Sequence, residues 1–163
     1  MQKVIVIGSP GAGKSTFSRK LREKTGLSLY YLDRFWHKSN QTTVSREEFV
    51  QQLAKITKRE EWIIDGNYLH TLDLRLAECD TVFLLDYPLS VCLAGVKSRI
   101  GKVREDLPWI ETEFDEEFKQ WIIDFPNNQL PQIYRLLDQY KETKNLIIFK
   151  SREEAEKYLQ ETF

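Results

Sequence analysis

A short stretch near the start of the chain combines glycines, a lysine and a hydroxyl group in a spacing that fits phosphate binding. Residues 8–15 read Gly-Ser-Pro-Gly-Ala-Gly-Lys-Ser and match G-x-x-x-x-G-K-[ST] at every fixed position. Glycines let the backbone wrap so that consecutive N–H groups point at phosphate oxygens. Lys14 can reach the β- and γ-phosphates of a nucleotide, and the Ser15 hydroxyl can bind Mg²⁺. The predicted nucleotide-binding residues are Gly8, Ser9, Pro10, Gly11, Ala12, Gly13, Lys14, Ser15 and Thr16.

The segments on either side of this loop support the prediction. Residues 4–7 are a run of Val and Ile, which is typical of a buried strand. Phe17 and Leu21 recur at helical spacing before Gly26, so a helix is expected to begin at the loop and to direct the positive end of its dipole at a phosphate. A flexible turn is the structural alternative, but a turn needs fewer glycines and no Lys-Ser pair at its exit.

Three other apolar, strand-like segments end in aspartate, at Asp33, Asp65 and Asp86. The carboxyl ends of parallel strands meet at one edge of a sheet, where ligands of open α/β sheets bind. A lone aspartate usually caps a helix or forms a turn, but three beside a phosphate loop predict a site for Mg²⁺ and a hydroxyl group. Ser15 and Asp65 are the predicted metal ligands, with capping of the following turn as the alternative for Asp65.

Strand and helix signals alternate along the chain, which predicts an α/β fold with a parallel sheet covered by helices. Five segments are predicted as strands: residues 4–7, 27–33, 61–66, 81–88 and 145–150. Helices are predicted from the phosphate loop to Gly26, within 67–80, and over residues 45–59, 88–102, 114–125, 129–142 and 151–160. Ser45 with Glu48 and Ser151 with Glu154 form capping boxes at two of these starts.

Two connections are expected to be irregular. Residues 34–44 are predicted as a loop, and Pro126 is predicted to end the helix before it. The segment 101–117 is the least regular and the most charged, so it is the candidate for a mobile lid. The whole chain, residues 1–163, is expected to form one domain around these elements.

The composition restricts the partners that this domain can bind. The chain has 163 residues with 24 basic and 25 acidic side chains, a formal net charge of -1, so no basic surplus favours nucleic acid or an anionic membrane. Cys79 and Cys92 stand in apolar stretches and are expected to be buried thiols. The chain has neither a leader-like start nor a membrane-length apolar run, so a cytoplasmic location is expected.

The motifs together resemble the nucleoside-monophosphate kinase superfamily, in which adenylate kinase and shikimate kinase are relatives. "WIIDGNY" is similar to the strand of adenylate kinases whose aspartate holds the water shell of the metal. "LDRFW", "TLDLRL", "CDTVFLLDYP" and "FDEEFKQWIIDFP" resemble FlaR-type DNA topology modulation proteins, a likeness that covers roughly residues 4–126. The resemblance implies a three-layer sandwich with strand order 2-3-1-4-5, the cofactors ATP and Mg²⁺, and a single P-loop kinase-like domain.

The resemblance also implies roles for several side chains. An aspartate in the place of Asp33 meets the acceptor hydroxyl in shikimate-kinase-like proteins, and a pair with Arg34 is the alternative. Lid arginines of the superfamily move onto the transferring phosphoryl group, which suggests Arg99 and Arg104, with Lys102 assisting. The alternative for these is exposed positions opposite the acidic run 111–117. Adenylate-kinase-like proteins bind adenine where Ser151 and Arg152 stand, although Ser151 can also be a simple helix cap.

Other side chains suit the binding of an acceptor. Arg75 can hold a phosphate or carboxylate with two parallel hydrogen bonds, or it can form a salt bridge with Asp73 or Glu78. Asn67 and Tyr68 can contact polar groups of the acceptor, with a turn and core packing as the alternatives. The predicted catalytic residues are Lys14, Asp33, Arg99 and Arg104, and the predicted substrate-binding residues are Asp33, Arg34, Asn67 and Arg75.

These observations predict an ATP-dependent small-molecule kinase that transfers the γ-phosphoryl group to a nucleotide, a nucleoside or another hydroxylated metabolite. The alternatives are an ATP-binding regulatory protein and a DNA topology modulator without a metabolite acceptor. A GTP-dependent switch is disfavoured because the chain has no N-K-x-D sequence for guanine. A DNA-binding factor is disfavoured by the acidic charge balance.

Overall fold

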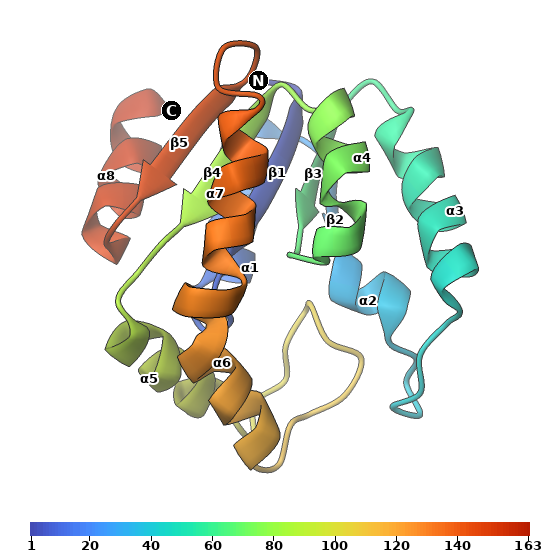
Figure 1. The fold of residues 1–163 in the computed structure, drawn as a ribbon, viewed down its shortest axis with the longest axis vertical. Helices are drawn as coiled ribbons and strands as arrows, with labels where there is room; N and C mark the ends of the chain where they lie inside the picture. The colour runs from blue at the N-terminus through green and yellow to red at the C-terminus, as the bar shows by residue number, and fades with distance from the viewer.

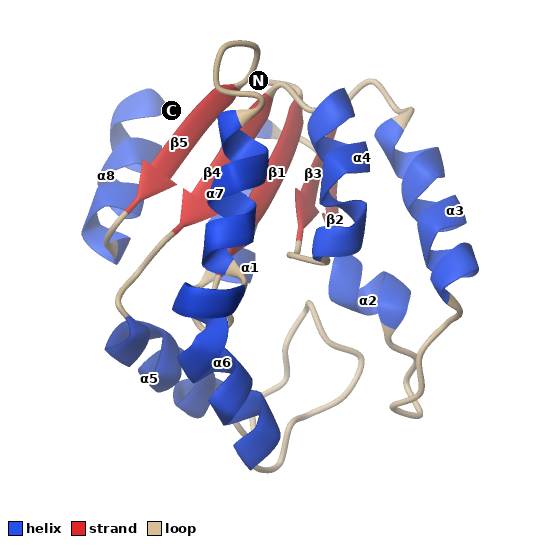
Figure 2. Cartoon of the chain, in the orientation of Figure 1, coloured by secondary structure: helices blue, strands red, loops and turns tan.

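The computed structural model describes residues 1–163, which form a parallel sheet between layers of helices (Figures 1 and 2). The sheet has five strands in the order β2-β3-β1-β4-β5, and every neighbouring pair is parallel. The strands are β1 (Lys3–Gly8), β2 (Leu29–Tyr31), β3 (Trp62–Asp65), β4 (Thr81–Leu85) and β5 (Asn145–Phe149). This topology confirms the predicted three-layer α/β sandwich and its strand order.

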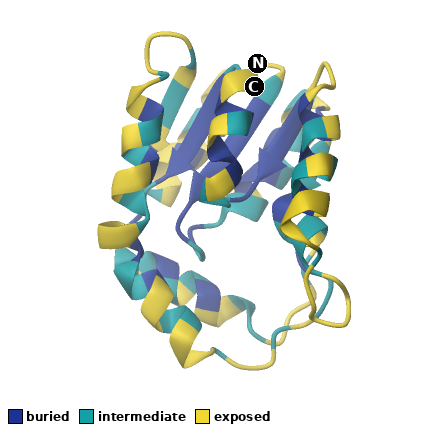
Figure 3. Cartoon of the chain, turned by 45° about the vertical axis from the view of Figure 1, so that its right-hand side comes forward, coloured by how far each residue is buried: buried dark blue, intermediate teal, exposed yellow.

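Alternating side chains of the strands build a core on each face of the sheet. Val4 and Val6 of β1 pack on one face, and Ile5 and Ile7 pack on the other, all fully buried. Strands buried on both faces carry continuous apolar runs, as these do. The first face is covered by α1 (Lys14–Thr25), α5 (Leu89–Arg99) and α8 (Arg152–Thr162), and the second by α3 (Arg46–Thr57), α4 (Leu72–Glu78) and α7 (Leu130–Asp138). Figure 3 shows the buried strands between helices whose outer surfaces are exposed.

Two of the predicted helix starts carry the expected caps. The Ser45 hydroxyl accepts from the Glu48 N–H at 3.1 Å, and the Ser151 hydroxyl accepts from the Glu154 N–H at 3.2 Å. The Glu154 carboxylate accepts from the N–H of Lys150, the residue before the N-cap Ser151. These bonds satisfy N–H groups that the first turn of a helix leaves without internal partners.

Two boundary predictions were wrong. Residues 34–44 do not form a loop throughout, because the short helix α2 (Leu32–Trp36) begins where the second strand was expected to continue. Pro126 does not end α6 (Glu116–Asn128). The Gln129 N–H reaches the Phe125 carbonyl at 3.0 Å, and buried Ile122 and Phe125 hold the last turn against the core. Proline removes one hydrogen bond there, and the turn continues without it.

The segment between α5 and α6 contains neither helix nor strand. In Figure 1 it runs below the carboxyl ends of the strands, between α5, α6 and α2. The 3₁₀ helix η1 (Leu69–Thr71) follows β3 at the same edge. Cys79 and Cys92 are buried free thiols, as predicted. Among the helices, none has the combination of length and apolar character that spanning a membrane requires.

Candidate active site

The phosphate loop lies between β1 and α1, as its flanking sequence predicted. Gly13 precedes α1 with φ 97°, and Gly11 has φ 82°, a backbone region that favours glycine. No side chain caps α1, so the N–H groups of its first turn stay available to a ligand. The Lys14 ammonium donates to the carbonyls of Gly8 at 3.0 Å and Ser9 at 3.3 Å. The loop therefore wraps around the Lys14 ammonium, and the N–H groups at the start of α1 beside it have no side-chain partner.

The loop packs directly against the backbone of α5. A Cβ atom placed on Gly95 would stand 2.0 Å from the Gly11 carbonyl oxygen, and one placed on Gly11 would stand 2.0 Å from the Cys92 carbonyl oxygen. Only glycine at both positions allows this approach. Because α5 also carries Arg99, one helix contacts the phosphate loop and bears a predicted lid arginine.

The two predicted metal ligands contact each other. The Ser15 hydroxyl donates to the Asp65 carboxylate at 2.8 Å, and the Asp65 side chain is buried at the end of β3. Burial raises the pKa of Asp65 to about 7, against the opposing effects of Lys14 and of the Ser15 hydrogen bond. A carboxylate and a hydroxyl beside free helix N–H groups form a donor set that suits Mg²⁺ with a phosphate ligand. The residues present therefore fit this cofactor.

Asn67 connects the strand after Asp65 to the phosphate loop. Its Oδ1 accepts from the Gly8 N–H at 3.0 Å, and its Nδ2 donates to the Gly8 carbonyl at 2.8 Å. The predicted contact of Asn67 with an acceptor is thus replaced by a bidentate contact with the backbone of the loop.

The structure contradicts the predicted role of Arg75 in substrate binding. The side chain is fully buried and donates to the carbonyls of Gly66, Asn67 and Tyr68. Neither suggested partner, Asp73 or Glu78, forms an ion pair with it. Burial lowers the pKa of Arg75 to about 9, which leaves the guanidinium charged at neutral pH. Arg75 therefore holds the backbone of the segment after β3 through these hydrogen bonds and does not line the cavity.

Asp33 lies in the first turn of α2 and is bound by a tyrosine from the other side of the site. The Tyr68 hydroxyl donates to Asp33 Oδ1 at 2.6 Å, which leaves Oδ2 free. Tyr68 has φ 37°, a left-handed conformation that non-glycine residues rarely adopt. Burial, followed by the proximity of Asp33, raises the pKa of Tyr68 far above its usual range, so the phenol stays a hydrogen-bond donor. Tyr68 therefore combines a strained backbone conformation with a hydrogen bond to Asp33.

The predicted lid arginines both face the cavity, but their donors are used differently. Arg104 donates from Nε and Nη2 to Asp106 and from Nη1 to Glu111. Arg99 has only an ion pair from Nε to Glu111 at 3.4 Å, and its terminal nitrogens have no partner in the chain. The alternative for Arg104, an exposed position opposite the acidic run 111–117, holds only for its partner Glu111, because the Arg104 side chain is 12% exposed. Arg99 is the guanidinium that remains available to a ligand.

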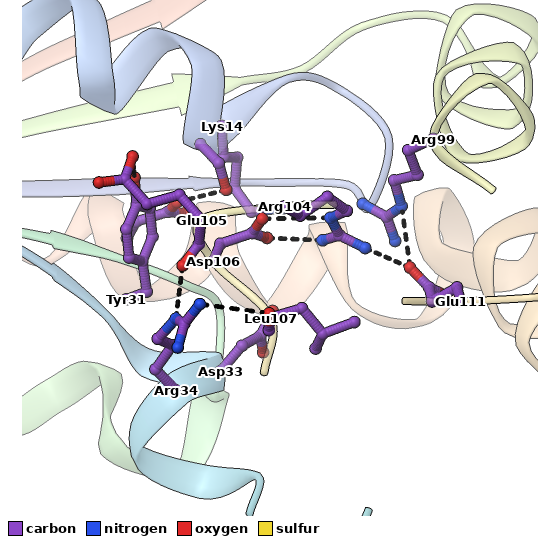
Figure 4. A network of polar contacts seen from close by, with 12 residues as sticks. Lys14, Tyr31, Asp33, Arg34, Arg99, Arg104, Glu105, Asp106, Leu107 and Glu111 are labelled. Atoms are coloured by element: carbon purple, nitrogen blue, oxygen red, sulfur yellow. Dashed lines mark hydrogen bonds and ion pairs between the residues drawn. The ribbon is translucent and has the colours of Figure 1, made fainter. Parts of the chain in front are cut away.

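The segment 101–117 is fastened across the site by side chains from three elements (Figure 4). Arg34 of α2 donates to the carbonyls of Glu105 and Leu107. It therefore does not pair with Asp33, and it does not line the cavity. The Glu105 carboxylate accepts from the Tyr31 hydroxyl at 2.8 Å and from Arg22 Nη1 at 3.0 Å. Sequence reasoning missed Glu105 and Asp106, because an acidic side chain in a charged loop gives no signal of its partner.

These groups surround one cavity of about 950 Å³. Loop residues 10–16 line it together with Asp33, Asp65, Asn67, Arg99 and Arg104. Arg34, Arg75 and Asp86 do not line it. The predicted role of Asp86 at the site is wrong, because its carboxylate accepts from Lys150 and from the Tyr134 hydroxyl and so joins β5 to α7. The structure therefore brings two of the three strand-end aspartates to the phosphate loop.

Comparisons with known proteins agree with this fold. No protein-family model matches the chain. The adenylate kinase of Thermotoga neapolitana is 28% identical over 97 residues, which are 58% of this chain and 43% of that protein, so the chain spans less than half the length of this curated relative.

Among solved structures, the shikimate kinase from Acinetobacter baumannii in complex with shikimate superposes with a TM-score of 0.62 at 18% identity, over 99% of this chain and 91% of that chain. An unliganded sugar kinase from Janibacter sp. HTCC2649 superposes with a TM-score of 0.53 at 16% identity, over 99% and 92% of the two chains. The chain thus has the fold of the P-loop kinases.

Proposed function

We propose that the protein is an ATP-dependent kinase that transfers the γ-phosphoryl group to a hydroxyl group of a small molecule. The observation that carries this proposal is the convergence of three groups on one cavity: the lysine of the phosphate loop, the Ser15–Asp65 pair and the Asp33 carboxylate. The adenylate kinase relative and the two kinases of similar fold support it.

Each group has a chemical task in this reaction. The N–H groups of α1 and the Lys14 ammonium bind the β- and γ-phosphates, so Lys14 exchanges its bonds to loop carbonyls for bonds to phosphate oxygens. Asp33 accepts a hydrogen bond from the acceptor hydroxyl and takes its proton late in the transfer. Arg99 places its free nitrogens on the charge that develops on the phosphoryl group. Ser15 and Asp65 would hold Mg²⁺, which neutralises phosphate charge when bound.

The segment 101–117 acts as the lid in this proposal. It covers the cavity with Arg104 and Asp106 while Arg34 holds its backbone. A lid excludes water, and water would otherwise compete with the acceptor for the phosphoryl group. The FlaR-type resemblance and the two alternatives, an ATP-binding regulatory protein and a DNA topology modulator, stay predictions from the sequence.

The test is acceptor-stimulated ADP release by the purified chain with Mg²⁺ and ATP, measured over a panel of nucleotides, nucleosides and other hydroxylated metabolites. We expect stimulation by at least one acceptor, and its loss in Lys14→Ala with the fold intact by circular dichroism. Asp33→Asn is expected to bind ATP normally and to lose roughly 100-fold or more in transfer rate. Full turnover by Lys14→Ala would contradict the proposal.

A further inference from the structure

The part of the cavity around Asp33 and the segment 101–117 is called the acceptor end here. Most of its charged side chains form ion pairs with one another. Arg104 is neutralised by Asp106 and Glu111, and Arg99 shares Glu111. Glu105 is paired with Arg22. No pair of free guanidinium groups is left there to bind a phosphate or carboxylate substituent.

Other basic side chains near this end are also held by the chain. Arg19, which lines the cavity, donates to the Thr16 hydroxyl at 3.3 Å and pairs with Glu105 at 3.9 Å. Arg34 is bound to the carbonyls of Glu105 and Leu107, and Arg75 is buried beneath the segment after β3. The anion-binding guanidiniums that the sequence offered are therefore both used by backbone carbonyls. An anionic acceptor would instead meet Asp33, whose free oxygen repels it.

The same end offers groups that suit a neutral hydroxylated molecule. Asp33 Oδ2 can only accept a hydrogen bond, and a hydroxyl is the donor that it needs. The cavity wall also includes the side chains of Leu69 and Trp121, and Trp121 is 40% exposed with its ring stacked on Phe118. An aromatic surface in the same cavity as the Asp33 carboxylate matches the apolar faces and polar edges of a cyclic polyol.

The geometry points to a neutral polyol as the acceptor class, an inference that rests on the proposed kinase function. The acceptor hydroxyl oxygen forms a bond to the γ-phosphorus, and the bond from that phosphorus to the bridging oxygen breaks. ADP leaves with the electron pair, and the hydroxyl proton passes to Asp33 and then to solvent. Discrimination against anions arises because acidic side chains or backbone carbonyls hold these arginines, while the free nitrogens of Arg99 are assigned to the transferring phosphoryl group.

The test compares matched acceptors in the ADP-release assay. Hexoses, pentoses, cyclic polyols and nucleosides are each paired with their phosphate monoesters and, where these exist, their carboxylates. We expect the accepted neutral compound to exceed its anionic counterparts by at least about tenfold in kcat/KM, which corresponds to about 1.4 kcal/mol. Preference for the anionic members, or ATP binding with no stimulation by any neutral polyol, would overturn this inference. Loss of ATP binding by the unaltered protein would overturn the proposed function instead.

A charge variant tests the cause of the selectivity. Glu111→Gln removes the acid shared by Arg99 and Arg104, so the anionic acceptors are expected to gain about tenfold relative to the neutral ones. Glu113→Gln, an exposed position of the same segment, is the matched control and should leave the ratio unchanged. An unchanged ratio in a folded Glu111→Gln protein would contradict the compensation argument.

Discussion

The Asn67 side chain holds both backbone groups of Gly8, at 3.0 Å and 2.8 Å, and its own carbonyl is held by the buried Arg75. The next residue, Tyr68, directs its hydroxyl to Asp33 at 2.6 Å. The short segment after β3 thereby joins the phosphate loop to the Asp33 carboxylate.

The first prediction concerns the contact between Asn67 and the phosphate loop. Asn67→Ala removes two hydrogen bonds to Gly8, which is worth about 1–3 kcal/mol in total. Because these bonds fix the loop, we expect the dissociation constant for ATP to rise about tenfold or more in isothermal titration calorimetry. Asn127→Ala, at an exposed position of α6, should bind ATP as the unaltered protein does. Equal affinity in the two variants would show that the loop holds its shape without Asn67.

The second prediction concerns Arg75 as a support of the segment after β3. Arg75→Met keeps much of the side-chain volume but leaves buried carbonyls without partners, which costs about 3 kcal/mol or more. We expect a lower midpoint of urea unfolding, whereas Arg135→Met, on the exposed side of α7, should change it little. Unchanged stability with weakened acceptor binding would restore the substrate role that the structure excludes.

The third prediction separates the two predicted lid arginines. Arg99 has free terminal nitrogens, so Arg99→Ala should lower kcat by about 10- to 1,000-fold with little change in the KM for ATP. Arg104 is bound to Asp106 and Glu111, so Arg104→Ala should loosen the segment 101–117. Limited proteolysis should then cut that segment faster in Arg104→Ala than in Arg99→Ala. Equal cleavage rates in the two variants would refute this division of roles.

The fourth prediction concerns the pH dependence of stability. Asp80 accepts from the N–H groups of Gln2 and Lys3, each at 2.8 Å, and from the Thr81 hydroxyl at 2.7 Å. Burial raises the pKa of Asp80, but these hydrogen bonds outweigh burial and hold it below its usual value of 3.8. The stabilisation is therefore present above pH 3.8 and is lost as the pH falls through the lower pKa of the folded protein.

The free energy of unfolding of Asp80→Asn should accordingly be about 1 kcal/mol lower than that of the unaltered protein at pH 7. The difference from the unaltered protein should shrink when urea unfolding is repeated at acidic pH. Asp138→Asn is the control, because Asp138 is exposed and paired only with Lys141. A difference that stays constant from neutral to acidic pH would rule out the ionised carboxylate as its source.

The strands and the loop between β1 and α1 could be predicted because they rest on local patterns, whereas the strand order followed from the resemblance to the nucleoside-monophosphate kinase superfamily. Glycine spacing around Lys14 and the apolar runs of the strands act over a few residues, so no distant contact is needed to recognise them. The helix α2 escaped prediction because its five residues lack a capping signal and follow directly on β2. Its presence matters, since it places Asp33 in a helical turn facing Tyr68.

The side-chain roles that failed depend on contacts between distant parts of the chain. A charged residue is rarely buried, so nothing local indicated that Arg75 would lie beneath the backbone. Asp86 directly follows β4, much as Asp65 ends β3, yet Tyr134 and Lys150, 48 and 64 residues away, bind Asp86 outside the cavity. Such pairings form only when distant parts of the chain pack together, so no local sequence pattern indicates them.

The most direct test of the account is the Mg²⁺-dependent binding of ATP, measured by isothermal titration calorimetry on the unaltered protein, Lys14→Ala and the control Lys24→Ala at the exposed end of α1. Lys14 should bind phosphate oxygens through charge-assisted hydrogen bonds, so its removal should weaken ATP at least about tenfold. The account predicts that Lys24→Ala binds ATP as the unaltered protein does and that Lys14→Ala does not. Equal affinity in all three proteins, or no ATP binding by the unaltered one, would contradict it.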